Sequence, residues 1–189
     1  MKYVAFIVSF FAALTAFADD HSGAPGVGEG AFVALMVQAK DPDAYIAMMK
    51  GNSAPFEALG SSVAGVCITK TGADYPGQMF VWNAFDSVEQ AMASTDAYDP
   101  MKAPAEMAAM RQVKYNVVFK PLKPFDLEPG SERLWRLNIA PKNLMPFVAK
   151  MTELEAALRA AGHNINVGVF QPLGGGAHET HHLRAASPS

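Results

Sequence analysis

The chain contains two copies of one pattern, which begin at Phe32 and at Leu134 and lie a constant 102 residues apart. At this offset apolar positions correspond to apolar positions and glycines to glycines, as Gly60 does to Gly162, without a gap. An internal repeat of this kind predicts two copies of one structural unit. The second copy reaches Ser189 at the point where the first begins its second helix, so we expect a C-terminally incomplete second unit.

Apolar periodicity predicts the order strand, helix, strand, strand, helix, strand in the first copy. The predicted strands lie at 32–37, 63–69, 79–85 and 113–120. We expect one helix from Asp41 to Gly60, interrupted near Gly51 and Pro55, and another that opens at Asp86. A separate short helix is expected over 101–110. In the last strand, residues 113, 115, 117 and 119 should share one face.

The second copy predicts a strand at 134–139, a helix at 143–161 and strands at 164–171 and 178–185. The fold class is therefore α+β, with two tandem ferredoxin-like units. We place the first unit at 31–121, the second at 133–189 and a proline-bearing linker at 122–132. A unit that lacks its last strand leaves a sheet edge unpaired, which favours self-association through the exposed sheet.

Residues 1–18 have the pattern of a secretory signal peptide, with Lys2 before an apolar stretch and Ala16-Phe17-Ala18 at its end. The stretch is short for a membrane span. We predict cleavage after Ala18, a flexible leader at 19–30, and a periplasmic or secreted protein without a membrane span. An uncleaved anchor is the alternative.

Charge and cysteine content exclude several classes of function. The formal net charge is −3 and no basic run could neutralise a row of phosphates, so we expect no nucleic-acid partner. The single cysteine, Cys67, cannot form an intramolecular disulfide. Its neighbours Val66 and Ile68 predict a strand, where Cys67 would serve as a small buried residue rather than a nucleophile.

Two such units in tandem resemble the dimeric α+β barrel superfamily, which includes antibiotic-biosynthesis monooxygenase-like domains. The resemblance rests on element order and apolar pattern over most of the chain after Ala18. It implies that two ferredoxin-like sheets pack into a barrel. Members of this class include cofactor-independent oxygenases, haem-handling proteins and isomerases, so the resemblance bears on fold more than on activity.

Five residues are candidates for binding a small apolar or aromatic ligand between sheet and helices. They are Tyr45 on the first helix and, on strands, Trp82, Asn83, Tyr115 and Asn116. In cofactor-independent oxygenases of this class, such side chains orient an aromatic substrate and stabilise its anion, so the resemblance implies that role here. The alternative for each residue is packing in the core or at an interface.

The sequence His178-Glu179-Thr180-His181-His182 matches the H-E-x-x-H motif, in which two histidines on a helix bind zinc. The repeat places these residues on a strand, where positions four apart are separated by about 13 Å. We therefore predict no zinc-protease site. His178 and His182 remain weak metal candidates, and a solvated polar strand end is the favoured interpretation.

No cofactor is predicted, because Gly174-Gly175-Gly176 lacks the helix of a phosphate-binding loop. The first hypothesis is an exported small-molecule-binding or structural protein of unknown ligand. The alternative is a cofactor-independent monooxygenase-like enzyme acting on a small aromatic substrate. A third is a purely structural or partner-binding domain whose candidate residues tolerate alanine. No nucleophile–base pair is evident from the sequence, so whether the chain is an enzyme stays open.

Overall fold

The structure is a computed structural model that describes residues 29–125, 129–174, 176 and 182–188. The predicted signal peptide, most of the leader and His178 lie outside the described residues. None of the described helices is both long and apolar enough to cross a membrane.

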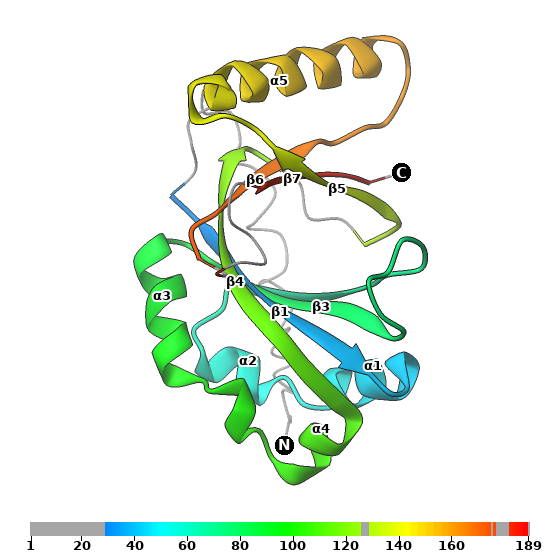
Figure 1. Cartoon of the computed structure of the whole chain (residues 1–189), viewed down its shortest axis with the longest axis vertical. Helices are drawn as coiled ribbons and strands as arrows, with labels where there is room; N and C mark the ends of the chain where they lie inside the picture. The colour runs from blue at the N-terminus through cyan, green and yellow to red at the C-terminus, as the bar shows by residue number, and fades with distance from the viewer. Residues whose placement is uncertain (1–28, 126–128, 175, 177–181, 189) are drawn as a thin grey trace, which may run out of the picture.

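The first unit has the predicted ferredoxin-like order. Its strands are β1 (Ala31–Ala39), β2 (Val63–Ile68), β3 (Gln78–Phe85) and β4 (Arg111–Lys123). Its helices are α1 (Pro42–Lys50), α2 (Ala54–Ala58), α3 (Val88–Ala97) and α4 (Ala105–Met110), with a 3-10 turn η1 (Pro100–Lys102). The strands pair in the order β2-β3-β1-β4, all antiparallel. Figure 1 shows all four helices on one side of this sheet.

Local sequence explains where these helices begin and end. The Asp41 side chain accepts a 3.0 Å hydrogen bond from the Ala44 N–H, and Pro42 follows in the first turn. α1 stops at Gly51 and α2 starts anew at Ala54, which confirms the predicted interruption. α3 begins one residue later than expected, because Ser87 rather than Asp86 provides the cap and accepts from Gln90.

The second unit repeats this arrangement in the described residues with three strands and one α-helix. These are β5 (Glu132–Asn138), the 3-10 turn η2 (Pro141–Asn143), α5 (Leu144–Ala160), β6 (Gly168–Pro172) and β7 (His182–Pro188). β7 pairs with both β5 and β6, which is the neighbour pattern of β3 in the first unit. β7 reaches Pro188, so Ser187 and Pro188 form strand rather than the start of a helix as the repeat register suggested.

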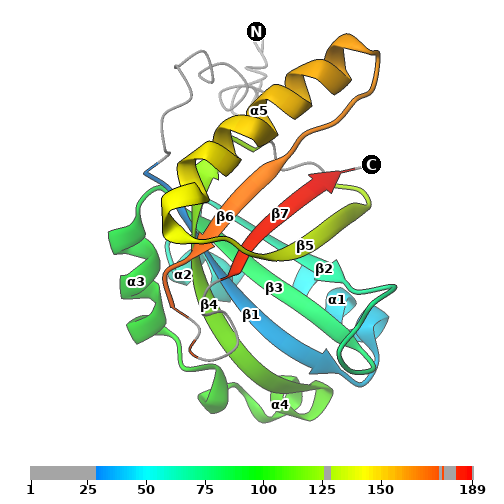
Figure 2. The ribbon, with the colours of Figure 1, turned by 45° about the horizontal axis from the view of Figure 1, so that its top comes forward.

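One seven-stranded sheet joins the two units, in the order β2-β3-β1-β4-β6-β7-β5. The join is β4, which has 13 residues and pairs with β1 at its start and β6 at its end. Leu122 and Lys123, expected in the linker, belong to this strand. Figure 2 shows β6 and β7 continuing the sheet beyond β4.

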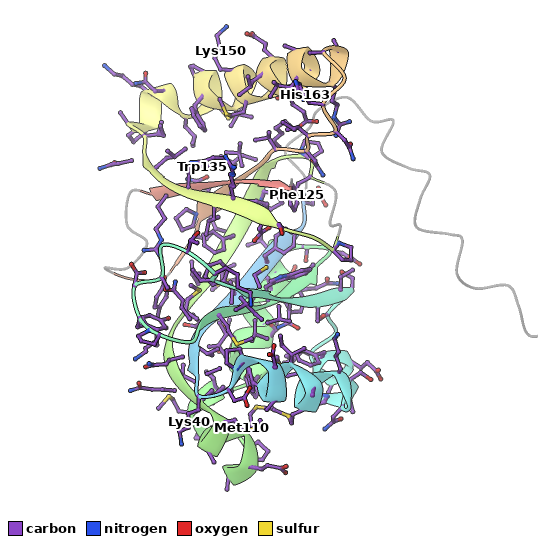
Figure 3. All side chains as sticks on the ribbon, turned by 90° about the vertical axis from the view of Figure 1, so that its right-hand side faces the viewer. Lys40, Met110, Phe125, Trp135, Lys150 and His163 are labelled. Carbon is purple, nitrogen blue, oxygen red and sulfur yellow. The ribbon has the colours of Figure 1, made fainter. Side chains whose placement is uncertain are left out.

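The sheet curls so that helices cover its outer face, while residues of β5 lie opposite the inner face of β1, β2 and β3. The four helices of the first unit and α5 of the second lie on opposite sides of the molecule, with the strands between them (Figures 1 and 3). Tyr45 and Met79 centre the core beneath the first set of helices. Val148 and Val169 centre the core beneath α5. We call the outer face of the sheet, which the helices cover, the helix side, and we call the inner face the barrel side.

Candidate functional site

A cavity of about 160 Å³ lies between the helix side of the first unit's sheet and the helices α1 to α4. We call it the helix-side cavity. Three of the five predicted ligand-binding residues line it: Tyr45, Asn83 and Asn116. Most of its wall is apolar, formed by residues such as Met48, Met49, Phe56, Leu59 and Val81.

Arg111, the first residue of β4, supplies the positive charge of this cavity. Its side chain is buried, with 7% of its surface exposed. Nη1 donates a 2.5 Å hydrogen bond to the hydroxyl oxygen of Tyr45, and Nη2 donates a 2.7 Å bond to that of Tyr98. The guanidinium carbon lies 5.7 Å from the centre of the Tyr45 ring. Two tyrosine hydroxyls and one aromatic face thus surround the guanidinium group.

Buried polar atoms in this cavity lack partners among the described residues. Arg111 Nε and Asn83 Oδ1 are both buried without a hydrogen bond. No acidic side chain in the described part of the chain forms an ion pair with Arg111. Buried charges in proteins are ordinarily paired and buried polar atoms ordinarily hydrogen-bonded. The cavity therefore presents an uncompensated cation and an unused acceptor.

A β-bulge in β4 directs Arg111 to the helix side. Val113 pairs with Val37 and Tyr115 with Met36, so the ladder skips Lys114. One extra residue reverses the alternation of side chains. Val113 consequently packs in the helix-side core, while Tyr115 packs on the barrel side with Val117 and Phe119. The expectation that Val113 shares a face with Tyr115 is wrong for this reason.

Tyr45 is completely buried on α1. Burial raises the pKa of its phenol above the usual value, and the neighbouring Arg111 only partly opposes this effect. Tyr45 is therefore protonated near neutral pH. Because its oxygen accepts from Arg111, its own proton is free to be donated to another acceptor.

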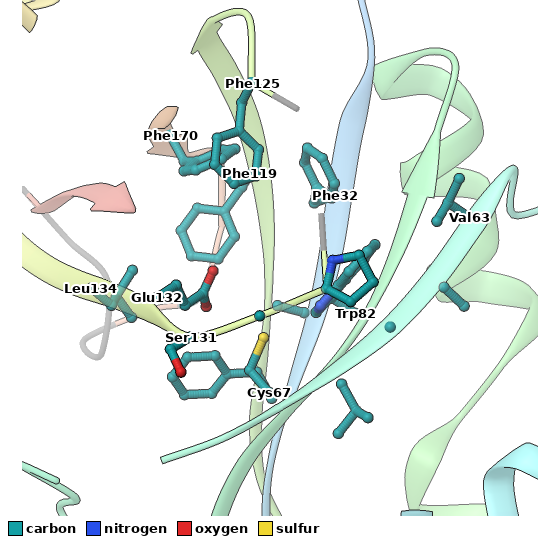
Figure 4. Close-up of a pocket in the computed structure, with 17 residues that line it drawn as sticks. Phe32, Val63, Cys67, Trp82, Phe119, Phe125, Ser131, Glu132, Leu134 and Phe170 are labelled. Atoms are coloured by element: carbon teal, nitrogen blue, oxygen red, sulfur yellow. The ribbon is translucent and has the colours of Figure 1, made fainter. Parts of the chain in front are cut away.

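A second, larger cavity of about 390 Å³ lies on the barrel side, between β2 and β5. We call it the barrel-side cavity; Figure 4 shows its lining. Trp82 points into it together with Phe32, Phe119, Phe125 and Phe170. Tyr115 packs in the same cluster of side chains as Trp82. The structure thus divides the five predicted residues between the two faces of one sheet.

Cys67 on β2 faces Glu132 at the start of β5, within this barrel-side cavity (Figure 4). Burial raises the pKa of the Cys67 thiol to about 12, and the Glu132 carboxylate adds to the rise. Thiolate is the nucleophilic form of cysteine, and this environment suppresses it. The geometry agrees with a packing residue rather than a nucleophile.

The predicted weak metal candidates fall outside the site as described. His178 is not among the described residues, and His182 is the first residue of β7. Within the described part of the chain, no group of three histidine, cysteine or acidic side chains could hold a metal ion.

Comparison with solved structures supports the fold. The chain is similar to chlorite dismutase from Candidatus Nitrospira defluvii in three mutant forms, one of them in complex with cyanide, with TM-scores of 0.54, 0.52 and 0.51. Each match is 9% identical and covers 86% of this chain and 77% of the other. At this identity the likeness shows the fold alone. No family model matches the sequence, and neither does any curated protein.

The chain shares the α+β, ferredoxin-like fold of these solved structures. Membership of the dimeric α+β barrel superfamily stays a prediction. The likeness does not extend to the antibiotic-biosynthesis monooxygenase-like family named from the sequence, which stays a prediction.

Arg111 and Tyr98 were not among the residues predicted to form a site. Arg111 lies between a predicted helix that ended at Met110 and a predicted strand that began at Val113, so neither pattern included it. Tyr98 is the residue that directly follows α3, two positions before Pro100. The position of Arg111 directly before an apolar strand could have indicated a site, because a charged side chain there is either solvated or held by specific partners.

Proposed function

We propose that this chain binds a small molecule in the helix-side cavity, with an apolar body of about one ring and one anionic group. The observation that carries the proposal is the buried guanidinium of Arg111, which has two tyrosine hydroxyls as partners and no described acid. A ligand carboxylate or oxyanion would supply the missing negative charge and an acceptor for Nε.

The volume of the helix-side cavity and its apolar lining support the other part of the proposed ligand, an apolar body of about one ring. About 160 Å³ is close to the volume of engineered apolar cavities that bind benzene. Met48, Met49 and Phe56 offer flexible and aromatic contacts for such a ring. Asn83 Oδ1 has no hydrogen-bond donor among the described residues, so a hydroxyl on the ligand would give it one.

Titration calorimetry of the purified chain with benzoate, 4-hydroxybenzoate and benzamide tests the proposal. We expect benzoate to bind at least tenfold more tightly than benzamide, which has the same shape without the charge. Arg111→Met should weaken benzoate binding tenfold to a hundredfold and leave benzamide nearly unchanged. Arg133→Met, on exposed β5, is the matched control and should bind benzoate normally.

Equal binding of benzoate and benzamide would contradict the role of Arg111. An Arg111→Met variant that is folded and binds benzoate as tightly as the unaltered chain would do the same. Binding of neither compound at millimolar concentration would instead favour a structural or partner-binding domain, in which Asn83 and Asn116 tolerate alanine.

A cofactor-independent monooxygenase-like activity is the second candidate, favoured by one observation. Arg111 and Tyr45 together could stabilise the oxyanion of a phenolic substrate, as hydrogen-bond donors do at an oxyanion. However, none of the residues that line the helix-side cavity is a histidine or a carboxylic acid that would remove the phenol proton. Oxygen uptake measured with phenols and quinols separates the two candidates, because a binding protein saturates without product.

Export and self-association also stand as proposals. Export is supported by the sequence pattern of residues 1–18, and mass spectrometry of the chain from its native host should find Asp19 as the first residue. Self-association is supported by β2 and β5, each of which pairs on one side only among the described strands. Light scattering of the purified chain, which gives its molar mass in solution, tests it.

A further inference from the structure

We infer that the barrel-side cavity is a second binding site, which takes a flat aromatic molecule that carries a protonated amine. This site lies on the opposite face of the sheet from the helix-side cavity and shares no lining residue with it. The inference is thus independent of the function proposed above. It rests on three properties of the lining: aromatic faces and edges, room made by glycines, and a single charge.

Aromatic side chains from several strands meet in this cavity. Phe32 contacts Trp82 edge to face at 5.8 Å between ring centres, and it contacts Phe170 at 5.6 Å. Phe125 contacts Phe170 in the same way at 5.4 Å. Edge-to-face contacts fix the orientation of each ring. A flat aromatic guest would therefore meet a wall of rings that is already ordered.

Two glycines make space for these rings. A Cβ atom on Gly65 would lie 2.2 Å from the indole ring of Trp82, because the indole lies over the backbone of β2. A Cβ atom on Gly168 would lie 2.6 Å from Phe170 and 2.7 Å from Phe125. Neither glycine has the positive φ that would require glycine for backbone reasons. Their role at these two positions is to let large rings line an open volume.

Glu132 is the one charged side chain among the described residues that line the cavity. It forms no ion pair with any described cation. Figure 4 shows its carboxylate directed into the cavity, toward Cys67. Because the raised pKa keeps the Cys67 thiol neutral, the Glu132 carboxylate alone sets the sign of the electrostatic potential beside these two residues, and that sign is negative. A protonated amine is complementary to this carboxylate, and the faces of Trp82 and the phenylalanines attract cations as well.

The volume sets the size of the guest. About 390 Å³ falls within the range of ordinary small-molecule pockets and exceeds what a single ring would fill. A two-ring aromatic amine such as tryptamine matches both the size and the charge. Indole-3-acetate has the same ring system with a negative group, and indole has the ring alone, so the three compounds isolate the contribution of charge.

Calorimetry with these three compounds, on the purified chain and on three variants, tests the inference. We expect tryptamine to bind at least tenfold more tightly than indole-3-acetate in the Arg111→Met background, where the helix-side cavity no longer attracts anions. Glu132→Gln should weaken tryptamine binding at least tenfold. Glu153→Gln removes one exposed carboxylate on α5 instead and should have no effect.

Labelling of the single cysteine locates the site without reference to affinity. Cys67 lines the cavity, so bound tryptamine should change the rate of its reaction with iodoacetamide, while benzoate should not. The inference is overturned if Glu132→Gln binds tryptamine as tightly as the unaltered chain does, if indole-3-acetate binds equally well, or if tryptamine at saturation leaves Cys67 labelling unchanged. Unchanged benzoate binding in Arg111→Met would overturn only the helix-side proposal.

Discussion

Arg111 Nη1 donates a 2.5 Å hydrogen bond to the hydroxyl of Tyr45, which lies 66 residues earlier in the chain. This bond ties the start of β4 to the middle of α1 across the helix-side cavity. Both residues are buried, so water does not replace the bond when it is broken.

Tyr45→Phe should destabilise the fold, because it removes the acceptor of a buried cation while keeping the ring. We expect a loss of about 1–3 kcal/mol in the free energy of unfolding, measured by urea denaturation. Tyr75→Phe is the matched control: the Tyr75 hydroxyl is buried without a partner among the described residues, so its removal should be neutral or stabilising. Equal losses in both variants would contradict the importance of the Arg111 contact.

The ion pair between Lys123 and Glu155 should make the free energy of unfolding fall as the pH is lowered into the acid range. Burial favours the neutral form of Glu155, but hydrogen bonds from Lys123 and from the Val167 N–H outweigh it and hold the pKa of Glu155 below its usual value. A lowered folded-state pKa stabilises the fold above the unfolded value of about 4.3, and this contribution disappears as the pH falls through the folded pKa. Denaturation curves between pH 7 and pH 3 measure it.

Glu155→Gln should cost about 3 kcal/mol at pH 7, because it removes the ion-pair partner of Lys123, which is only 6% exposed. The pH dependence below 5 should flatten in the same variant. Glu153→Gln removes an exposed pair with Lys150 and should change neither quantity measurably. An unchanged acid transition in Glu155→Gln would refute the assignment.

Gly65→Ala should displace Trp82. The added methyl would overlap the indole ring, and overpacking of this kind costs about 1–3 kcal/mol. Tryptophan fluorescence in a Trp135→Phe background reports on Trp82 alone and should shift, since the chain has two tryptophans. Gly130 also lines the barrel-side cavity, but apart from its chain neighbours no atom of the described residues lies within 4 Å of a Cβ added there. Gly130→Ala should therefore leave both the stability and the spectrum unchanged.

Cys67 should be a slow nucleophile. A rise of the thiol pKa from 9.0 to about 12 lowers the thiolate fraction at pH 8 roughly 1,000-fold. Reaction with a disulfide reagent such as DTNB should be slower by about that factor in the native chain than in urea. Glu132→Gln removes one cause of the raised pKa and should accelerate the native reaction. Equal native and denatured rates would show that the thiol is not shielded as the structure indicates.

Much of the fold followed from the repeat. The constant offset between the copies and the interruption near Gly51 were enough to predict ferredoxin-like order, because apolar periodicity reports which faces are buried. The junction was not predictable in the same way. β4 continues through Pro121 to Lys123 and pairs with β6, because Pro121 lies where the ladder between these strands is irregular.

The grouping of the candidate residues could be predicted from the sequence in part, and their role in binding stays a prediction. Tyr45, Asn83 and Asn116 do meet in one cavity, as expected of polar residues on apolar elements. Trp82 and Tyr115 lie on the other face, and Arg111 was overlooked. Alternation along a strand gives two faces only while the ladder is regular, and the bulge at Lys114 ends that regularity. No local pattern in 111–119 distinguishes a bulged strand from a straight one.

The bulge also bears on how chains of this fold are compared. In a straight strand that continued the alternation of Tyr115, the residue at position 111 would lie on the barrel side instead of the helix side. Two homologues can thus align residue for residue along β4 while the side chain of the same arginine lies on the helix side in one and on the barrel side in the other. Residues of β4 in two such proteins are equivalent only if their side chains lie on the same face of the sheet, and a sequence alignment alone does not show this.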